Sequence, residues 1–287
     1  MMSLLKSHVI VLGLTVWAGA GVAANSGGNP PAASVAVMMV AGKTGALGFV
    51  ARCKAIRQLG TKLNAYDIAL LYEFLDIKAG GNDVSPEELN ALKNDVANAL
   101  KKQEIRPEEF ARRLMVMFRD PAHDAVWRDY CVQHLGDMFD MIENEEVRLA
   151  VYTLFWEATR EKNGTIPGTA LIALYNRSGR SNFDQARLAG VALAMVSDGY
   201  GEPATITALQ ICAKLGEIKA LPVARQWAVS DSAMVRVSAI ACIGSLGEGQ
   251  DLVLLEKYAS GTDVRMKMAA RAAIRKLKDR EGNDDQK

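Results

Sequence analysis

The feature that most constrains the fold is an internal repeat of 31 residues near the end of the chain. Its units close with Leu-Gly at 215–216, Leu-Gly at 246–247 and Leu-Lys at 277–278. The segments that end in these pairs share apolar residues at positions 1, 3, 9 and 12, and each has alanine at position 5, namely Ala208, Ala239 and Ala270. A period of this length is typical of stacked structural units, not of one closed domain.

Each unit has the pattern of two helices joined by a glycine turn. Apolar residues recur at three- and four-residue steps, which predicts amphipathic helices, and strand-like alternation is absent from about Leu47 onward. The segments 204–216 and 235–247 are followed by second amphipathic stretches around 221–229 and 252–259. A pair this short cannot enclose a core alone, so the units must stack. The sequence therefore predicts an all-α chain with an α-solenoid over residues 43–278.

Weaker copies of the first helix occur upstream. Segments 47–60 and 124–136 also end in Leu-Gly, while 146–159 and 183–197 have only the Val-Arg or Ala-Arg opening. Segment 183–197 ends closer to Leu215 than the repeat period allows. This spacing predicts that the second helix between that segment and Leu215 is missing or shortened. Glycines that punctuate the pattern, including Gly136 and Gly216, are expected to end helices.

The Val-Arg, alanine and Leu-Gly positions resemble HEAT repeats, in the short armadillo-type form of about 30 residues known from phycobilin-lyase-like repeat proteins of bacteria. The resemblance is strongest over 204–278 and weaker over 47–75 and 122–176. Segment 119–136 looks like part of exported bacterial HEAT-repeat proteins. The resemblance implies a right-handed α-solenoid of stacked helix pairs with a binding or scaffolding role, and it carries no catalytic residues.

The N-terminus has the pattern of a secretory signal peptide over residues 1–24. Lys6 precedes an apolar run from Val9 to Ala23, and small residues then fit a cleavage site. An uncleaved anchor helix is the alternative, although the run is shorter than the roughly 20 residues of a membrane span. We expect an exported protein, periplasmic or extracellular, with no stable span after cleavage, a flexible linker over 25–42 and a polar tail over 279–287.

The net charge of the chain indicates no charged partner. The chain has 34 Lys+Arg and 33 Asp+Glu, so its net charge of +1 favours neither nucleic acid nor an anionic membrane.

An even number of cysteines in an exported chain suggests disulfides, yet the spacing of Cys53, Cys131, Cys212 and Cys242 contains no CxxC and places the last three at core positions. We therefore interpret the cysteines as buried free thiols, although a disulfide between Cys212 and Cys242 stays possible.

Three segments have part of a ligand-binding pattern. Ala41 to Thr44 contains Gly-Lys-Thr but lacks the earlier glycine of a phosphate loop. Asp76 to Glu88 lacks calcium ligands in either frame and fits a helix capping box of Ser85 and Glu88 better. Cys131 and His134 share one helix face with Asp137 near, and the three could hold zinc, but Cys131 is at a core position and His134 abuts the helix end.

Two charged patterns have ordinary structural explanations. The pairs Glu108-Glu109 and Glu145-Glu146 open predicted helices, where carboxylates suit the helix dipole. Lys267, Arg271 and Arg275 form a basic stripe on the last helix, which suits either a polyanion or the polar outer face that a terminal unit needs. We therefore predict no catalytic, cofactor-binding or metal-ligating residues.

The leading functional hypothesis is a non-enzymatic module of the cell envelope that binds or scaffolds a protein or peptide. The alternative is an enzyme or a metal-dependent site within the divergent residues 119–200, and a third reading is a purely structural part of an envelope assembly. A groove lined by the second helices of the pairs would favour binding, because such arrays present extended surfaces. A closed polar pocket near His134 would favour an enzyme.

Overall fold

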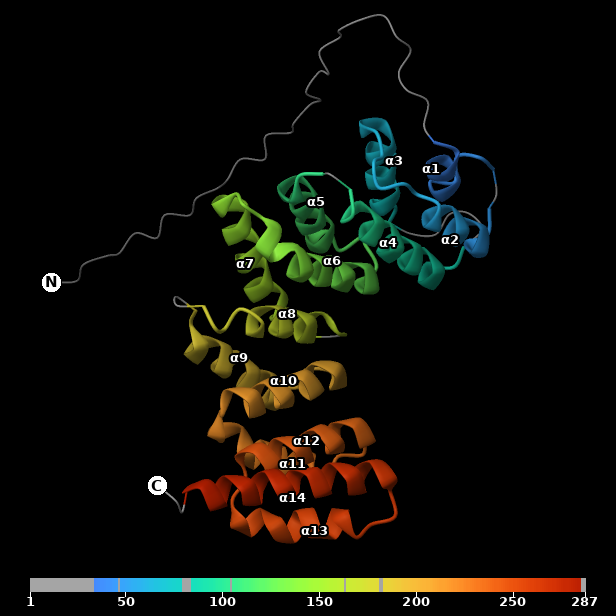
Figure 1. The fold of residues 1–287 in the computed structure, drawn as a ribbon. Helices are drawn as coiled ribbons and strands as arrows, with labels where there is room; N and C mark the ends of the chain where they lie inside the picture. The colour runs from blue at the N-terminus through green and yellow to red at the C-terminus, as the bar shows by residue number, and fades with distance from the viewer. Residues whose placement is uncertain are drawn as a thin grey trace, which may run out of the picture. The chain divides into compact units, whose positions relative to one another are not determined.

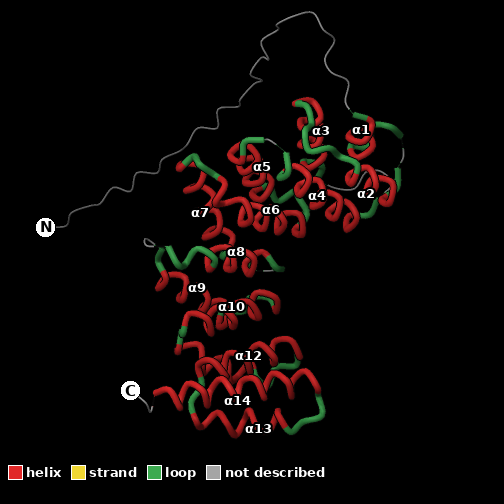
Figure 2. Tube along the Cα trace, in the orientation of Figure 1, coloured by secondary structure: helices red, strands yellow, loops and turns green. Residues whose placement is uncertain are grey.

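The computed structural model describes residues 34–45, 47–78, 84–103, 105–162, 164–180 and 183–284. Within these ranges the chain is helical and contains no β-strand, as the sequence predicts (Figure 2). No helix in the described ranges is both long and apolar enough to cross a membrane. The predicted signal peptide, residues 1–24, lies outside the described residues.

Fourteen α-helices follow one another through the described part of the chain, and short 3-10 turns precede or follow some of them. The helices are α1 (Val35–Val40), α2 (Phe49–Arg57), α3 (Ala65–Leu75), α4 (Pro86–Leu100), α5 (Pro107–Arg119), α6 (Ala125–Met138), α7 (Glu145–Ala158), α8 (Ile166–Tyr175), α9 (Gln185–Ser197), α10 (Glu202–Leu215), α11 (Leu221–Trp227), α12 (Ala233–Leu246), α13 (Leu252–Ala259) and α14 (Val264–Asp284). The 3-10 turns are η1 (Phe139–Met141), η2 (Ile218–Ala220) and η3 (Gly249–Asp251).

The helices pack in two rows. In the first row α2, α4, α6, α8, α10, α12 and α14 each pack against the next (Figure 1). The second row consists of α1, α3, α5, α7, α9, α11 and α13, and each of these packs against at least one helix of the first row. Neighbours also pack within the second row at α1–α3, α5–α7 and α9–α11. This alternation is compatible with an α-solenoid.

The repeated alanines lie where first-row helices meet. Ala208 of α10, Ala239 of α12 and Ala270 of α14 are all fully buried. A methyl group at these positions lets the neighbouring helix approach closely, which a longer side chain would prevent. Position 3 of the repeat is different, because Met268 in α14 is 68% exposed. The equivalent Ile206 and Val237 are half-buried against the core, so the position leaves the core only in the last unit.

Two of the helix assignments made from the repeat are wrong. Segments 146–159 and 183–197 resemble first-row helices in sequence, but α7 and α9 lie in the second row. The first-row helix between them is α8, which lacks both the Val-Arg opening and the Leu-Gly close. No second helix is missing before Leu215, since α9 fills that place between α8 and α10.

Glycine ends one helix as predicted and not another. Gly216 closes α10 in the left-handed conformation at φ 69°, where glycine is favoured. Gly136 lies inside α6, which continues to Met138, so its predicted role as a helix end is wrong. A Cβ at Gly136 would lie 3.5 Å from the Cβ of Ala173. The backbone carbonyl of Gly136 accepts a hydrogen bond of 2.6 Å from Arg177 of the next unit. This glycine therefore contributes to packing between α6 and the end of α8.

Both ends of the array extend beyond the predicted limits. The linker expected over 25–42 overlaps α1, whose Val37 and Val40 are fully buried. Ser34 caps this helix by accepting a hydrogen bond of 3.3 Å from the backbone of Val37. At the other end α14 continues to Asp284, into the predicted polar tail. Arg280 holds it by donating hydrogen bonds to the carbonyls of Ser245, in the last turn of α12, and of Gly247.

Candidate functional site

A groove opens between two neighbouring helices of the second row, α3 and α5. Its cavity has a volume of about 500 Å³. The lining residues are Ala69, Tyr72, Glu73 and Asp76 from α3, and Arg112, Arg113, Val116 and Met117 from α5. The two helices approach at the base, where the rings of Tyr72 and Phe110 are 5.9 Å apart. This is a groove along the second helices of the pairs, the feature that favours a binding role.

Tyr72 forms the floor of the groove and has an unusual environment. The residue is only 4% exposed, and its buried hydroxyl has no hydrogen-bond partner. Burial, with a further contribution from nearby Glu109, raises the pKa of Tyr72 to about 12, although Arg113 opposes the rise. The hydroxyl therefore stays protonated and is a hydrogen-bond donor without an acceptor.

The charged side chains of the groove lie on opposite walls, Arg112 and Arg113 on α5 and Glu73 and Asp76 on the α3 side. Arg113 lies with its guanidinium carbon 4.2 Å from the centre of the Tyr72 ring and makes one exposed ion pair of 3.3 Å with Glu109. Arg112 is exposed and forms no hydrogen bond or ion pair within the described residues. On the opposite wall Glu73 pairs with Lys43 at 3.2 Å, and Asp76 contacts His123 at 3.2 Å. The lining thus contains two cations and two acids, and neither sign of charge is in excess.

Val116 adds an exposed apolar side chain to the α5 wall. It is 68% exposed, whereas the neighbouring Met115 and Met117 are buried. Val116 thus occupies a position on α5 where the helix pattern otherwise places a polar residue. The sequence patterns do not predict this groove, and Val116 is the one residue in the sequence that could have indicated it.

The end of α3 is held by a polar cluster, which we call the clasp and define as Asp76, Lys78, Lys93, Asp120 and His123. His123 contacts Asp76, Lys78 pairs with Asp120, and Lys93 donates a hydrogen bond to the carbonyl of Ile77. The clasp ties residues 76–78 to α4 and to the connection between α5 and α6. It therefore fixes one end of the α3 wall of the groove.

Two groups of the clasp are buried and have lowered pKa values. Burial lowers the pKa of Lys93 to about 8, and its ammonium lies 5.2 Å from the centre of the Trp127 ring. Burial also lowers the pKa of His123, with Lys93 adding to the effect and Asp76 opposing it. A cavity of about 260 Å³ lies beside them and is lined by Lys78, Asn90, His123 and Asp124 among others. Such shifts occur in functional sites and also in structural networks.

The possible zinc ligands Cys131, His134 and Asp137 do not form a metal site. Cys131 and His134 are buried, neither ring nitrogen of His134 has a partner, and Asp137 pairs with Lys101 at 2.9 Å. Among the described residues no group of three His, Cys, Asp or Glu side chains is placed to hold a metal ion. The cavity between α6 and α8, of about 300 Å³, is lined by Gln133, Gly136 and Asp137 but not by His134.

The other sequence candidates have structural roles. Lys43 of the Gly-Lys-Thr segment pairs with Glu73, and the guanidinium of Arg52 lies against Gly42 in the turn between α1 and α2. Ser85 and Glu88 form the predicted capping box at the start of α4, with Pro86 in its first turn. Part of the Asp76–Glu88 segment, residues 79–83, lies outside the described residues.

The acidic pairs and the basic stripe also lie where the patterns predict. Glu108-Glu109 and Glu145-Glu146 fall in the first turns of α5 and α7. Glu108 accepts hydrogen bonds of 2.9 and 3.2 Å from the backbone N–H groups of Glu143 and Asn144, which helps to lower its pKa. Of the stripe on α14, Arg271 and Arg275 are exposed and Lys267 is half-buried.

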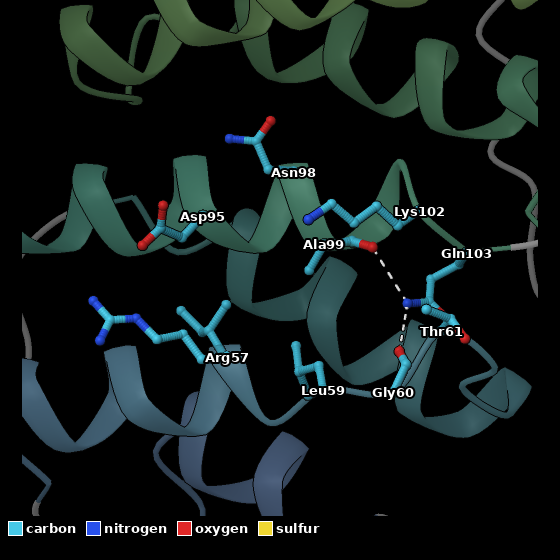
Figure 3. Close-up of a pocket in the computed structure, with 10 residues that line it drawn as sticks. Arg57, Leu59, Gly60, Thr61, Asp95, Asn98, Ala99, Lys102 and Gln103 are labelled. Carbon is cyan, nitrogen blue, oxygen red and sulfur yellow. Dashed lines mark hydrogen bonds between the residues drawn. The ribbon is translucent and has the colours of Figure 1, made fainter.

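A second hollow, between α2 and α4, is lined largely by polar side chains (Figure 3). The Gln103 side-chain amide donates to the carbonyls of Gly60 and Ala99 at 2.8 and 3.3 Å, and its oxygen accepts from the backbone of Leu63 at 2.9 Å. Gln103 thus holds the α2–α3 connection against α4. Arg57, Asp95 and Lys102 are the charged residues of the lining, two cations and one acid.

All four cysteines are free thiols in the structure. Cys131, Cys212 and Cys242 are buried, as their repeat positions predict, and Cys53 is half-buried. Burial raises the pKa of Cys212 and of Cys242 to about 12, with Cys242 adding to the effect on Cys212, so neither is a reactive thiolate near neutral pH.

Comparison of the chain with protein-family models and with curated proteins gave no match.

Proposed function

We propose that this protein is a non-enzymatic module that binds a partner protein through the groove between α3 and α5. The observation that carries the proposal is the groove itself, which combines a buried tyrosine ring, an exposed valine and two arginines in the second row. Binding sites of this kind are concave and largely apolar, with a few polar groups that fix orientation. Exposed apolar side chains gathered in such a place favour an interaction site.

We further propose that the array is a right-handed α-solenoid of HEAT-like helix pairs. Support comes from the two rows of helices and from the buried small residues at equivalent repeat positions, Ala208, Ala239 and Ala270. Arrays of this type use their extended surfaces to hold other chains. The scaffold would keep α3 and α5 at a fixed spacing, so that the groove exists before the partner arrives and little ordering is needed on binding.

An enzyme or metal-dependent site within 119–200 is the weaker alternative. One observation favours it, namely buried His123 beside Lys93 with its pKa of about 8. These two side chains are already engaged with Asp76 and with the carbonyl of Ile77, both at the end of α3. Their contacts are explained by holding that end of the helix in place, which serves the groove as well as the fold.

A substitution of the exposed Val116 in the groove tests the proposed function. Val116→Glu places a charge in the groove without removing a buried group, and Val253→Glu is the matched control, since Val253 is 76% exposed on α13 of the same row. A partner retained from envelope extract and identified by mass spectrometry should be lost with Val116→Glu and kept with Val253→Glu. Equal retention by the two variants would show that the groove is not the binding site.

The proposal also places the protein outside the cytoplasm, on the basis of the signal-peptide pattern over residues 1–24. The intact mass of the exported protein tests this part separately. A mass that corresponds to a chain starting near Asn25 is expected. A full-length mass would mean that the segment is not removed.

A further inference from the structure

We propose that the outward face of α14 docks the protein on an anionic phospholipid surface. We call it the basic face and define it as Val264, Lys267, Met268, Arg271 and Arg275. The inference goes beyond the proposed function, because these residues lie on the last helix of the first row and not in the α3–α5 groove. It rests on the charge of α14, on its exposed apolar side chains and on its departures from helix preference.

The first observation is the charge of α14. Residues 264–278 contain no acid and six cations, which are Arg265, Lys267, Arg271, Arg275, Lys276 and Lys278. The two helices that pack against α14, namely α12 and α13, contain one acid between them. Among the described residues, the side chains of Lys267, Arg271 and Arg275 make no hydrogen bond or ion pair. The net charge of +1 for the whole chain therefore conceals a local excess of positive charge on this helix.

The nearest acids of the same segment lie at the two ends of the basic face. Asp263 precedes α14 and accepts a hydrogen bond of 3.0 Å from the backbone N–H of Met266. Asp279 is four residues after Arg275, and in the described part of the chain the two do not form an ion pair. The cations between these acids therefore keep their charge available to a partner.

Two exposed apolar side chains lie among the cations. Val264 and Met268 are each 68% exposed. At 3.6 residues per turn the five positions of the basic face fall on one side of the helix, opposite the buried Met266, Ala270 and Ala273. Cations with apolar side chains between them suit the surface of a bilayer, where the apolar groups enter the boundary below the headgroups and the cations meet the phosphates.

A solubility cap at the end of the array explains only part of this pattern. Arg271 and Arg275 stand 31 residues after Ile240 and Gly244, which are buried in α12. The two arginines therefore disfavour the stacking of a further helix or of a second copy on α14. A mixture of acids, amides and cations would serve that purpose as well, without two exposed apolar side chains. Lipid headgroups can rearrange around long side chains and are not kept away by them.

The cations also make α14 less stable, which a purely structural face would avoid. Arg265 and Lys267 lie near the start of the helix, where the dipole favours acids, and no acid is present in the first turn. Lys267, Arg271 and Arg275 follow one another at steps of four, so like charges are neighbours and repel. Departures from local preference of this kind are expected at functional sites. An anionic surface would supply counter-charges to all of these cations.

Sedimentation of the full chain with sucrose-loaded vesicles tests the inference. Vesicles of phosphatidylcholine with about 30% phosphatidylglycerol should bind the protein, and vesicles of phosphatidylcholine alone should bind it weakly. The double variant Arg271→Gln/Arg275→Gln should lower the partition coefficient about 20-fold, as for roughly fivefold per cation at an anionic surface. The matched control is Arg57→Gln/Arg160→Gln, which removes two exposed arginines on α2 and after α7 and should bind like the wild type.

A second variant tests the apolar contribution. Met268→Gln removes exposed apolar surface and no charge, so it should lower the partition coefficient about threefold. All of these substitutions are at exposed positions. The thermal midpoint of Arg271→Gln/Arg275→Gln should equal or slightly exceed that of the wild type, because repulsion between like charges is relieved.

Equal binding to the two kinds of vesicle, binding to neither, or an equal loss with the control pair would overturn the inference. So would polyglutamate that binds through Arg271 and Arg275 when anionic vesicles do not bind, because the occupant would then be an acidic protein. The partner retained through Val116 should still be retained by Arg271→Gln/Arg275→Gln, so the two proposals can fail separately.

Discussion

Gly244 of α12 lies so close to Ala273 of α14 that a Cβ added to the glycine would be 2.5 Å from both the Cα and the Cβ of Ala273. The two helices meet through backbone and a single methyl group at this point. The close approach is the tightest constraint that the glycines of the array place on the stacking of first-row helices. It explains why a residue that is unfavourable inside a helix is present in the last turn of α12.

Gly244→Ala should destabilise the protein by about 1–3 kcal/mol, because the added methyl has no space and α14 must shift. Gly190→Ala is the matched control in α9, since nothing lies within 4 Å of its added Cβ. There the same substitution should stabilise by up to about 1 kcal/mol through helix propensity. Denaturant midpoints measure both effects, and two changes of the same sign would contradict the close packing of α12 on α14.

Leu246→Ala should cost about 2–5 kcal/mol, since Leu246 is only 6% exposed and its removal leaves a cavity. Ala239→Leu should cost about 1–3 kcal/mol by overpacking the contact between first-row helices. Lys257→Gln on the exposed face of α13 should stay within about 0.5 kcal/mol. Urea unfolding compares the three, and similar midpoints for all of them would mean that the repeat positions do not form the core.

His134 should make the protein less stable in mild acid. Burial, with help from Lys101 and against Asp137, lowers its pKa to about 4 from the usual 6.5. The unfolded chain therefore binds a proton between these values and the folded chain does not, so stability falls as pH drops from about 6.5 toward about 4. The loss from this group should reach about 3 kcal/mol.

The measurement for His134 is the free energy of unfolding of the wild type and of His134→Leu across this pH range. The difference between the two should change steadily from pH 7 to pH 4 in favour of the variant. A constant difference would show that His134 does not titrate as its buried position predicts.

Asp251→Asn should cost about 1.5–3 kcal/mol at neutral pH, because Asp251 accepts hydrogen bonds of 2.7 and 2.9 Å from Arg225 and is only 4% exposed. Burial by itself would raise the pKa of Asp251, but the bonds from Arg225 and from the backbone of Glu248 lower it below its usual value. The stability that the pair contributes should therefore be present at neutral pH and be lost as pH falls through that lowered pKa. Thermal melts of the variant and the wild type should converge in strong acid, and melts that stay equally far apart would contradict this role.

The helix content and much of the stacking can be predicted from the sequence because the repeat marks its own contact positions. Ala208, Ala239 and Ala270 recur with the period and are all buried. The pattern fails at α8, whose residues are buried on nearly every side and so lack a polar face. Without that helix the sequence cannot assign α7 and α9 to the second row, and the row order becomes visible only from the packing of α8 against α6 and α10.

The groove could not be predicted, for two physical reasons. Tyr72 has the spacing of a core residue, and the absence of a partner for its hydroxyl depends on the distance between α3 and α5, which no local pattern encodes. The clasp joins Asp76 to His123, which are 47 positions apart in the chain. Only Val116 gave a local sign, as an apolar residue at a polar position of α5.

Site-specific photocrosslinking in living cells tests most directly whether the groove binds a partner protein. A photoreactive amino acid at position 116 should give one discrete adduct, and the same residue at position 253, equally exposed on α13, should give none. No adduct at position 116, or the same adducts at both positions, would contradict the account.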